Sequence, residues 1–256
     1  MMSLITSEFR KAFSTKLLFI LSLSALAFVL LTVVLGVYLT PGPPGQEDVN
    51  ALMDPAAVTN IYSSAGGASV FVLILGIIAM SGEYRNQTIT STFLATPRRQ
   101  SVIVAKMITY SILSFVIALV MWIATVVVAT LLLTTVDHAP TDWNSVFEIL
   151  GGALLGLVLY AILGVAIGAL ITNQVAAVVI ALIWIFVVEG LLTVFVDWIG
   201  KWLPGGALNS ILQATNTSGF GGTDALSVPV AAGVLIAYTA VFALAAVIST
   251  NRKDIT

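Results

Sequence analysis

Glu189 is the one ionisable side chain deep within an apolar stretch of this sequence. Insertion scales assign roughly 2.5–3.5 kcal/mol to a charged residue at the centre of a bilayer, so such side chains usually face a bundle interior or a cavity. No basic residue lies at a matching depth, and the expected partner is a hydroxyl, from Tyr160 or Tyr238, or water. Two roles stay open for Glu189: a protonated acid that locks helices together, or a group that acts directly on a substrate or a proton.

Residues 82–99 form the longest polar, charged interval between two strongly apolar segments. No glycine or proline lies between Gly82 and Pro97, although loops usually contain such residues. A short helix along the membrane surface therefore fits this interval better than an ordinary cytoplasmic loop, which is the alternative. Such a helix would offer a soluble partner a place to dock.

The sequence lacks the common signatures of enzymes. It contains no G-x-x-x-x-G-K-[ST] phosphate loop, no G-x-S-x-G elbow and no H-E-x-x-H helix. It has no cysteine and a single histidine, His138, so a thiolate site or a histidine cluster is not expected. We expect no catalytic residue, no metal, no cofactor bound by this chain and no nucleic-acid partner. Any ATP that powers its function must be hydrolysed by another polypeptide.

Transmembrane helices must hold these polar residues in place. Hydrophobic residues make up 59% of the chain and charged residues 9%, against roughly 25% charged in soluble domains. The apolar runs are continuous, unlike the alternating segments of a transmembrane barrel. The sequence predicts an all-α polytopic membrane protein with a single domain over residues 1–256. Six spans are expected at about residues 17–39, 61–81, 106–135, 147–172, 175–197 and 228–249.

Two further features concern helix surfaces. Residues 3–16 place apolar side chains on one helical face and Glu8, Arg10 and Lys11 elsewhere, which predicts an amphipathic helix in the inner membrane interface. A disordered basic N-terminus is the alternative. The fourth span carries small residues at four-residue spacing, which let two helices approach closely in lipid. These are Gly152 and Gly156, and Gly164 and Gly168.

The distribution of basic residues predicts the orientation. If the N-terminus is cytoplasmic, six spans place the C-terminus there as well, and only Lys201 among the basic residues lies outside. The positive-inside rule therefore predicts that both termini are cytoplasmic. The basic residues then inside are Arg10, Lys11, Lys16, Arg85, Arg98, Arg99, Lys106, Arg252 and Lys253.

A short motif resembles a known family. The run Gly82-Glu83-Tyr84-Arg85, followed by Thr88-Ile89, Phe93-Leu94 and Pro97-Arg98-Arg99, resembles the signature of the type-2 ABC transporter permease family. The N-terminal amphipathic helix, Glu189 and the run Leu203-Pro204-Gly205-Gly206-Ala207 are similar to the actinobacterial drug-export branch. The likeness covers the whole chain in topology and two short motifs in sequence.

The resemblance implies a permease subunit of an ATP-driven ABC exporter in the bacterial plasma membrane. It would move an amphipathic or hydrophobic substrate, such as a drug, antibiotic, peptide or lipid, by alternating access. Residues 82–97 would be the coupling helix, residues 3–16 a connecting helix on the inner leaflet, and residues 198–228 would include short re-entrant helices at the outer mouth. The residues that contact the ATPase would be Glu83, Tyr84, Arg85, Thr88, Phe93 and Arg98, with Glu83 and Arg85 as charged anchors.

The same resemblance implies the partners. ATP and Mg²⁺ would be bound by separate ATPase subunits, and a second permease chain, identical or not, would pair with this one in the lipid. Two rival functions remain: a proton-coupled secondary transporter that uses Glu189, and a membrane scaffold or immunity protein that transports nothing. A secondary transporter is expected to show internal repeats, and the two halves of this sequence share no convincing similarity.

Overall fold

The computed structural model describes residues 1–40, 50–88, 99–214 and 225–252, and these residues form helices and their connections, with no strand among them. Six helical stretches in this part of the chain are long and apolar enough to cross a membrane. The all-α fold with six spans that the sequence predicts is therefore confirmed.

Four of the spans are single helices, and two are composite. The single helices are α2 (Lys16–Leu39), α6 (Arg99–Leu133), α7 (Trp143–Leu170) and α12 (Val228–Arg252). The second span joins α3 (Pro55–Tyr62), the 3₁₀ helix η2 (Ser63–Ala68) and α4 (Ser69–Arg85). The fifth joins α8 (Gln174–Ile183), the π-helix η3 (Trp184–Val188) and α9 (Glu189–Phe195).

Four shorter helices complete the described chain. The helix α1 (Met2–Ser14) precedes the first span, and η1 (Ala51–Met53) precedes the second. Between the fifth and sixth spans lie α10 (Asp197–Gly200) and α11 (Pro204–Ile211), within the interval where short re-entrant helices were expected.

Side-chain caps start several helices. Asp142 precedes α7, and its Oδ1 accepts a hydrogen bond from the backbone N–H of Asn144 at 3.0 Å. Asn173 precedes α8 and accepts in the same way from the backbone N–H of Ala176 at 3.1 Å. These caps satisfy N–H groups that have no partner within a helix. The Asn173 cap lets α8 begin within a few residues of the end of α7.

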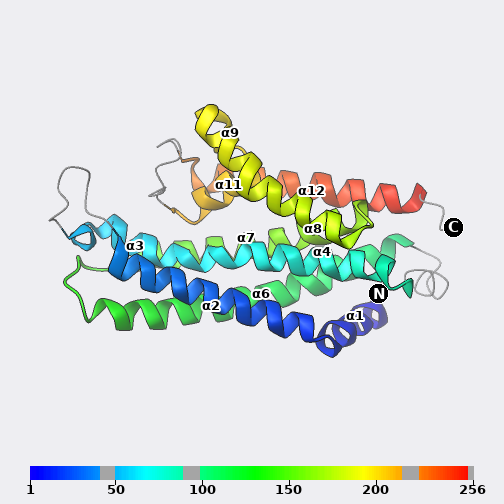
Figure 1. The fold of residues 1–256 in the computed structure, drawn as a ribbon, viewed down its shortest axis with the longest axis horizontal. Coiled ribbons are helices and arrows are strands. Elements are labelled where there is room, and N and C mark those ends of the chain that lie inside the picture. Colours follow the sequence, from blue (N-terminus) through cyan, green and yellow to red (C-terminus); the bar gives the residue numbers. More distant parts are fainter. Residues whose placement is uncertain (41–49, 89–98, 215–224, 253–256) are drawn as a thin grey trace.

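The helix α7 lies at the centre of the bundle, with α4 packed along it (Figure 1). These two spans bury most of their residues, whereas the other four leave most of theirs at least partly exposed. In Figure 1 the composite α8–α9 span crosses the bundle obliquely, and α11 lies between α9 and α12. The helix α1 and the C-terminal end of α12 lie at the same end of the bundle.

Glycines on α7 allow α4 to approach at backbone distance. A Cβ atom at Gly164 would lie 2.2 Å from the carbonyl oxygen of Leu73, and one at Gly168 would lie 2.5 Å from that of Ile77. From the other side, a Cβ at Gly76 of α4 would lie 2.5 Å from the carbonyl oxygen of Ala161. Small residues on both helices make this crossing possible in lipid.

The other glycine pair of α7 faces a different neighbour. A Cβ at Gly152 would lie 2.7 Å from the carbonyl oxygen of Ile211, and one at Gly156 would lie 2.3 Å from Leu208 Cδ1. Both contacts are with α11. The four glycines therefore admit two elements, α4 along one half of α7 and α11 along the other.

The boundary of the second span differs from its expected position. The helix α4 continues to Arg85, so residues 82–85 form its last turn and do not begin a separate coupling helix. Asn86 and Gln87 then form a turn, in which Gln87 has a φ of 55°. Residues 89–98, which hold most of the predicted coupling helix, lie outside the described residues. Glu83 lies in this last turn of α4 and is buried.

Candidate functional site

Four charged side chains from three helices meet at the end of the bundle where α1 lies. Lys106 of α6 pairs with Glu8 of α1, and its Nζ lies 3.1 Å from Glu83 Oε1 of α4. Lys11 of α1 places its Nζ 2.7 Å from both Glu8 Oε1 and Glu83 Oε1. The side chains of Lys106 and Glu8 are only 2% and 4% exposed, so this ion cluster is a buried connection between α1, α4 and α6.

The ion cluster is electrically balanced, with two ammonium groups and two carboxylates. Burial lowers the pKa of Lys11, but its hydrogen bonds to Glu8 and Glu83 outweigh that effect and leave the pKa above its ordinary value. Lys11 therefore stays charged at neutral pH. Because an unpaired buried charge is costly, each member of the cluster depends on the other three, and the three helices are held in one arrangement.

The predicted ATPase-contacting residues fall into two environments. Glu83, expected as an exposed charged anchor, is buried in the ion cluster, which corrects its expected placement. Tyr84 is half-buried, whereas Arg85 and Thr88 are exposed. Arg85 Nη1 donates to Gln174 Oε1 of α8 at 3.3 Å. Phe93 and Arg98 lie outside the described residues.

Sequence reasoning did not find the ion cluster. It took Glu189 as the one deeply placed ionisable residue, but Lys106 is 1% exposed within a candidate span. It also assigned Glu8 and Lys11 to a polar helix face. The available signal was Lys106 itself, since a lysine inside an apolar helix requires a carboxylate partner at the same level. Which carboxylate pairs with Lys106 depends on how α1 packs against α4 and α6.

Glu189 has different partners from those expected. Its Oε1 accepts a hydrogen bond from Trp184 Nε1 at 2.9 Å, and its Oε2 accepts one from the backbone N–H of Gly205 at 2.8 Å. The expected hydroxyl partner is therefore replaced by an indole and a main-chain amide. Tyr160 lines the same cavity without a hydrogen bond to Glu189 among those shown, and Tyr238 is a partly buried residue of α12 outside that cavity.

A π-helix explains the pairing of Trp184 with Glu189. Side chains five positions apart do not share a face of a regular α-helix, where neighbours are three or four apart. The π-helical turn η3 bonds residues five apart and brings these two together. Helical periodicity of 3.6 residues could not have predicted this contact.

Gly205 is needed where α11 meets the carboxylate. A Cβ at this position would lie 2.3 Å from Glu189 Oε2. Pro204 occupies the first turn of α11, a position that suits proline because no intrahelical N–H bond is lost. The carboxylate thus lies at the amino end of α11, where free N–H groups favour negative charge.

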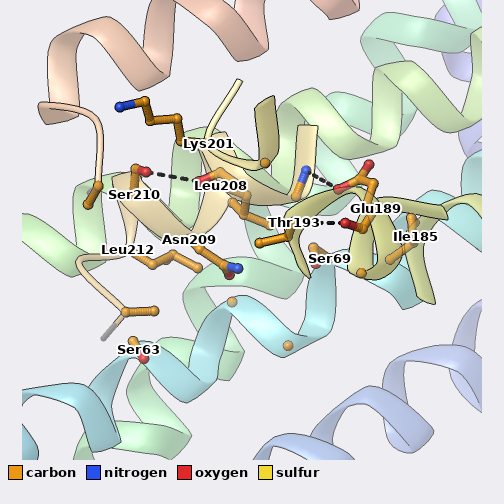
Figure 2. A pocket seen from close by; sticks show the side chains of 18 of the residues that line it. Ser63, Ser69, Ile185, Glu189, Thr193, Lys201, Leu208, Asn209, Ser210 and Leu212 are labelled. Carbon is orange, nitrogen blue, oxygen red and sulfur yellow. Dashed lines mark hydrogen bonds between the residues drawn. The ribbon is translucent and has the colours of Figure 1, made fainter. Parts of the chain in front are cut away.

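A cavity of about 750 Å³ opens beside Glu189 (Figure 2). Its wall comes from η2, α4, α7, the composite fifth span, α10 and α11. In Figure 2 Ser69 lies close to Glu189, Ser63 lies at the opposite side of the view, and Asn209 lies between Ser63 and Glu189. The cavity lies toward the end of the spans opposite the ion cluster. Among the described residues, no three carboxylate or histidine side chains come together as metal ligands.

Comparison with protein families gives one match. A family model described as "ABC-2 family transporter protein" matches residues 4–188, which is more than two thirds of the 256 residues. The match includes most of α1, the four residues of the ion cluster and the chain up to the residue before Glu189. A comparison with curated proteins finds no match.

Proposed function

The chain belongs to the ABC-2 transporter family, and from this membership we propose that it is the permease subunit of an ATP-driven exporter for amphipathic or hydrophobic substrates. Members of this family are membrane subunits of ABC transporters and not the ATPases. The family match and the six apolar spans carry the proposal together. ATP and Mg²⁺ belong to partner ATPase subunits, and a second permease chain completes the transport path.

The ion cluster supports a specific route for coupling. It joins α1, the last turn of α4 and the first part of α6, and the segment from Asn86 to Arg98 connects those last two helices. We place this end of the bundle in the cytoplasm, with both termini, because most basic residues gather there. A force applied by an ATPase to residues 86–98 would move α4, α6 and α1 together, and so would be transmitted to the spans.

Arg85 tests this route, because it is exposed at the end of α4 and lies outside the ion cluster. We expect Arg85→Glu to lower the amount of ATPase that co-purifies with the tagged chain by about tenfold or more, since a like-charge contact in an interface costs several kcal/mol. The ATPase is identified by its phosphate-loop motif and by Mg²⁺-dependent ATP hydrolysis.

The matched control is Arg10→Glu, which makes the same charge change at an exposed position of α1. It is expected to retain the ATPase. Glu83 is unsuitable as a surface probe, because its substitution would disrupt the buried ion cluster. If the unaltered chain brings down no ATPase from its native cells, the exporter function is wrong, and proton coupling through Glu189 or a scaffold role takes its place.

A further inference from the structure

The cavity beside Glu189 has the size of a site for a small organic molecule. Its volume of about 750 Å³ falls within the roughly 300–1,000 Å³ of ligand pockets. Small residues create this space, because Ser63, Gly66, Gly67 and Ser69 line the side formed by the second span, and Gly205 and Gly206 line the side formed by α11. The cavity is therefore built where the second span and α11 pack beside the fifth span.

Glu189 places a carboxyl group at this cavity with acceptor capacity left over. The residue is 6% exposed, and each carboxylate oxygen accepts one hydrogen bond, from Trp184 and from Gly205. An ionised carboxylate offers about four acceptor sites. Both donors are neutral, and the ion pairs formed among the described residues do not include Glu189. A positively charged ligand would supply the counter-charge that the protein leaves out.

Aromatic and apolar side chains line the remaining wall. Tyr160, Phe186 and Trp198 contribute rings, and Leu208 and Leu212 contribute aliphatic surface. Aromatic faces attract cations, more strongly where water is excluded. The cavity thus combines one carboxylate with surfaces that suit the apolar body of a cation.

Lys201 also lines the cavity, but it does not neutralise Glu189. Figure 2 shows its ammonium group directed away from Glu189, beyond Ser210. Lys201 has an interaction of its own.

We propose that this cavity binds an amphipathic organic cation, whose charged centre pairs with Glu189 and whose apolar body lies against the aromatic wall. The inference rests on the proposed export function in one respect, since we take amphipathic organic cations to be the substrates that the protein transports. Binding itself needs no ATPase, so the two ideas can fail separately.

The test measures equilibrium binding of tetraphenylphosphonium to the full chain in phosphatidylcholine nanodiscs, with empty nanodiscs subtracted. Tetraphenylborate has nearly the same size and shape and the opposite charge, so it serves as the matched ligand. Saturable binding of the cation, with no saturable binding of the anion in a separate titration, is the expected result. Failure of the unaltered chain to prefer the cation overturns the proposal without recourse to any variant.

Three substitutions then locate the site. Glu189→Gln should weaken cation binding by about tenfold or more, because a charge-assisted contact becomes a neutral one, whereas Glu189→Asp should keep most of the affinity. Asn209→Phe, which narrows the cavity and leaves the carboxylate in place, should also weaken binding. The control Glu148→Gln makes the same chemical change at an exposed residue of α7 that bonds Gln213 outside the cavity, and should bind as the unaltered chain does.

Each outcome separates the two proposals. Equal affinity of Glu189→Gln and the unaltered chain, with both monodisperse, overturns the cation site. If an ATPase co-purifies but the cation does not bind, the export function stands and the substrate class is wrong. If the cation binds and no ATPase is found, the site stands and the ATP-driven function is wrong.

Discussion

Gly164→Ala is expected to prevent α4 and α7 from packing, and most of the protein should be lost as aggregate. The added Cβ would lie 2.2 Å from the carbonyl oxygen of Leu73, 3.0 Å from its carbonyl carbon and 3.1 Å from its Cα. A backbone group cannot rotate aside as a flexible side chain can, so the two central helices must separate. Overpacking typically destabilises by about 1–3 kcal/mol, and contact with main-chain atoms places Gly164 at or above the upper end of that range.

Gly151→Ala is the matched control, since it makes the same change on the same helix where nothing lies within 4 Å of the new Cβ. Alanine stabilises a helix interior by up to about 1 kcal/mol relative to glycine, so this variant should have an unchanged or higher Tm. Both are measured by size-exclusion chromatography of detergent-solubilised protein after heating. A Gly164→Ala variant as heat-resistant as Gly151→Ala would contradict the close crossing of α4 and α7.

Lys106→Met is expected to destabilise the protein by about 3–5 kcal/mol, the cost of breaking a buried ion pair by removing one partner. The substitution leaves the carboxylates of Glu8 and Glu83 buried together with Lys11 as their remaining counter-charge. Among the described residues, the buried Oε2 atom of Glu83 has no hydrogen-bond partner, so few contacts can compensate this carboxylate for the loss of Lys106. The expected readout is a large fall in Tm of the purified chain.

The control for this prediction is Lys16→Met, which removes the same charge at an exposed position at the start of α2. A double variant, Glu83→Gln with Lys106→Met, should be less destabilised than the sum of the two single changes, because it removes charges of both signs. Additive effects, or a Tm for Lys106→Met close to that of Lys16→Met, would show that the cluster does not hold α1, α4 and α6 together.

Local sequence properties were sufficient for the fold class and the six spans. A continuous apolar run of 20 or more residues must form a helix in lipid, because its backbone groups have no other partners. The motif at residues 82–99 also indicated the family before the comparison showed it. The glycine spacing on α7 marked a close-packed face, but it could not show that α4 and α11 divide that face between them.

The tertiary structure alone decided which polar groups meet. Glu8 and Lys106 are 98 residues apart in the chain, and Glu83 looked like an exposed anchor because its sequence neighbours are polar. Glu189 contacts Trp184 because a π-helical turn separates them, and it contacts Gly205 because α11 packs against the fifth span. A regular helical period predicts neither contact. Whether a segment enters the membrane depends on its summed local hydropathy, which the sequence gives directly. A buried ion pair instead requires two side chains from distant parts of the chain to meet, and only the packing of the helices determines whether they do.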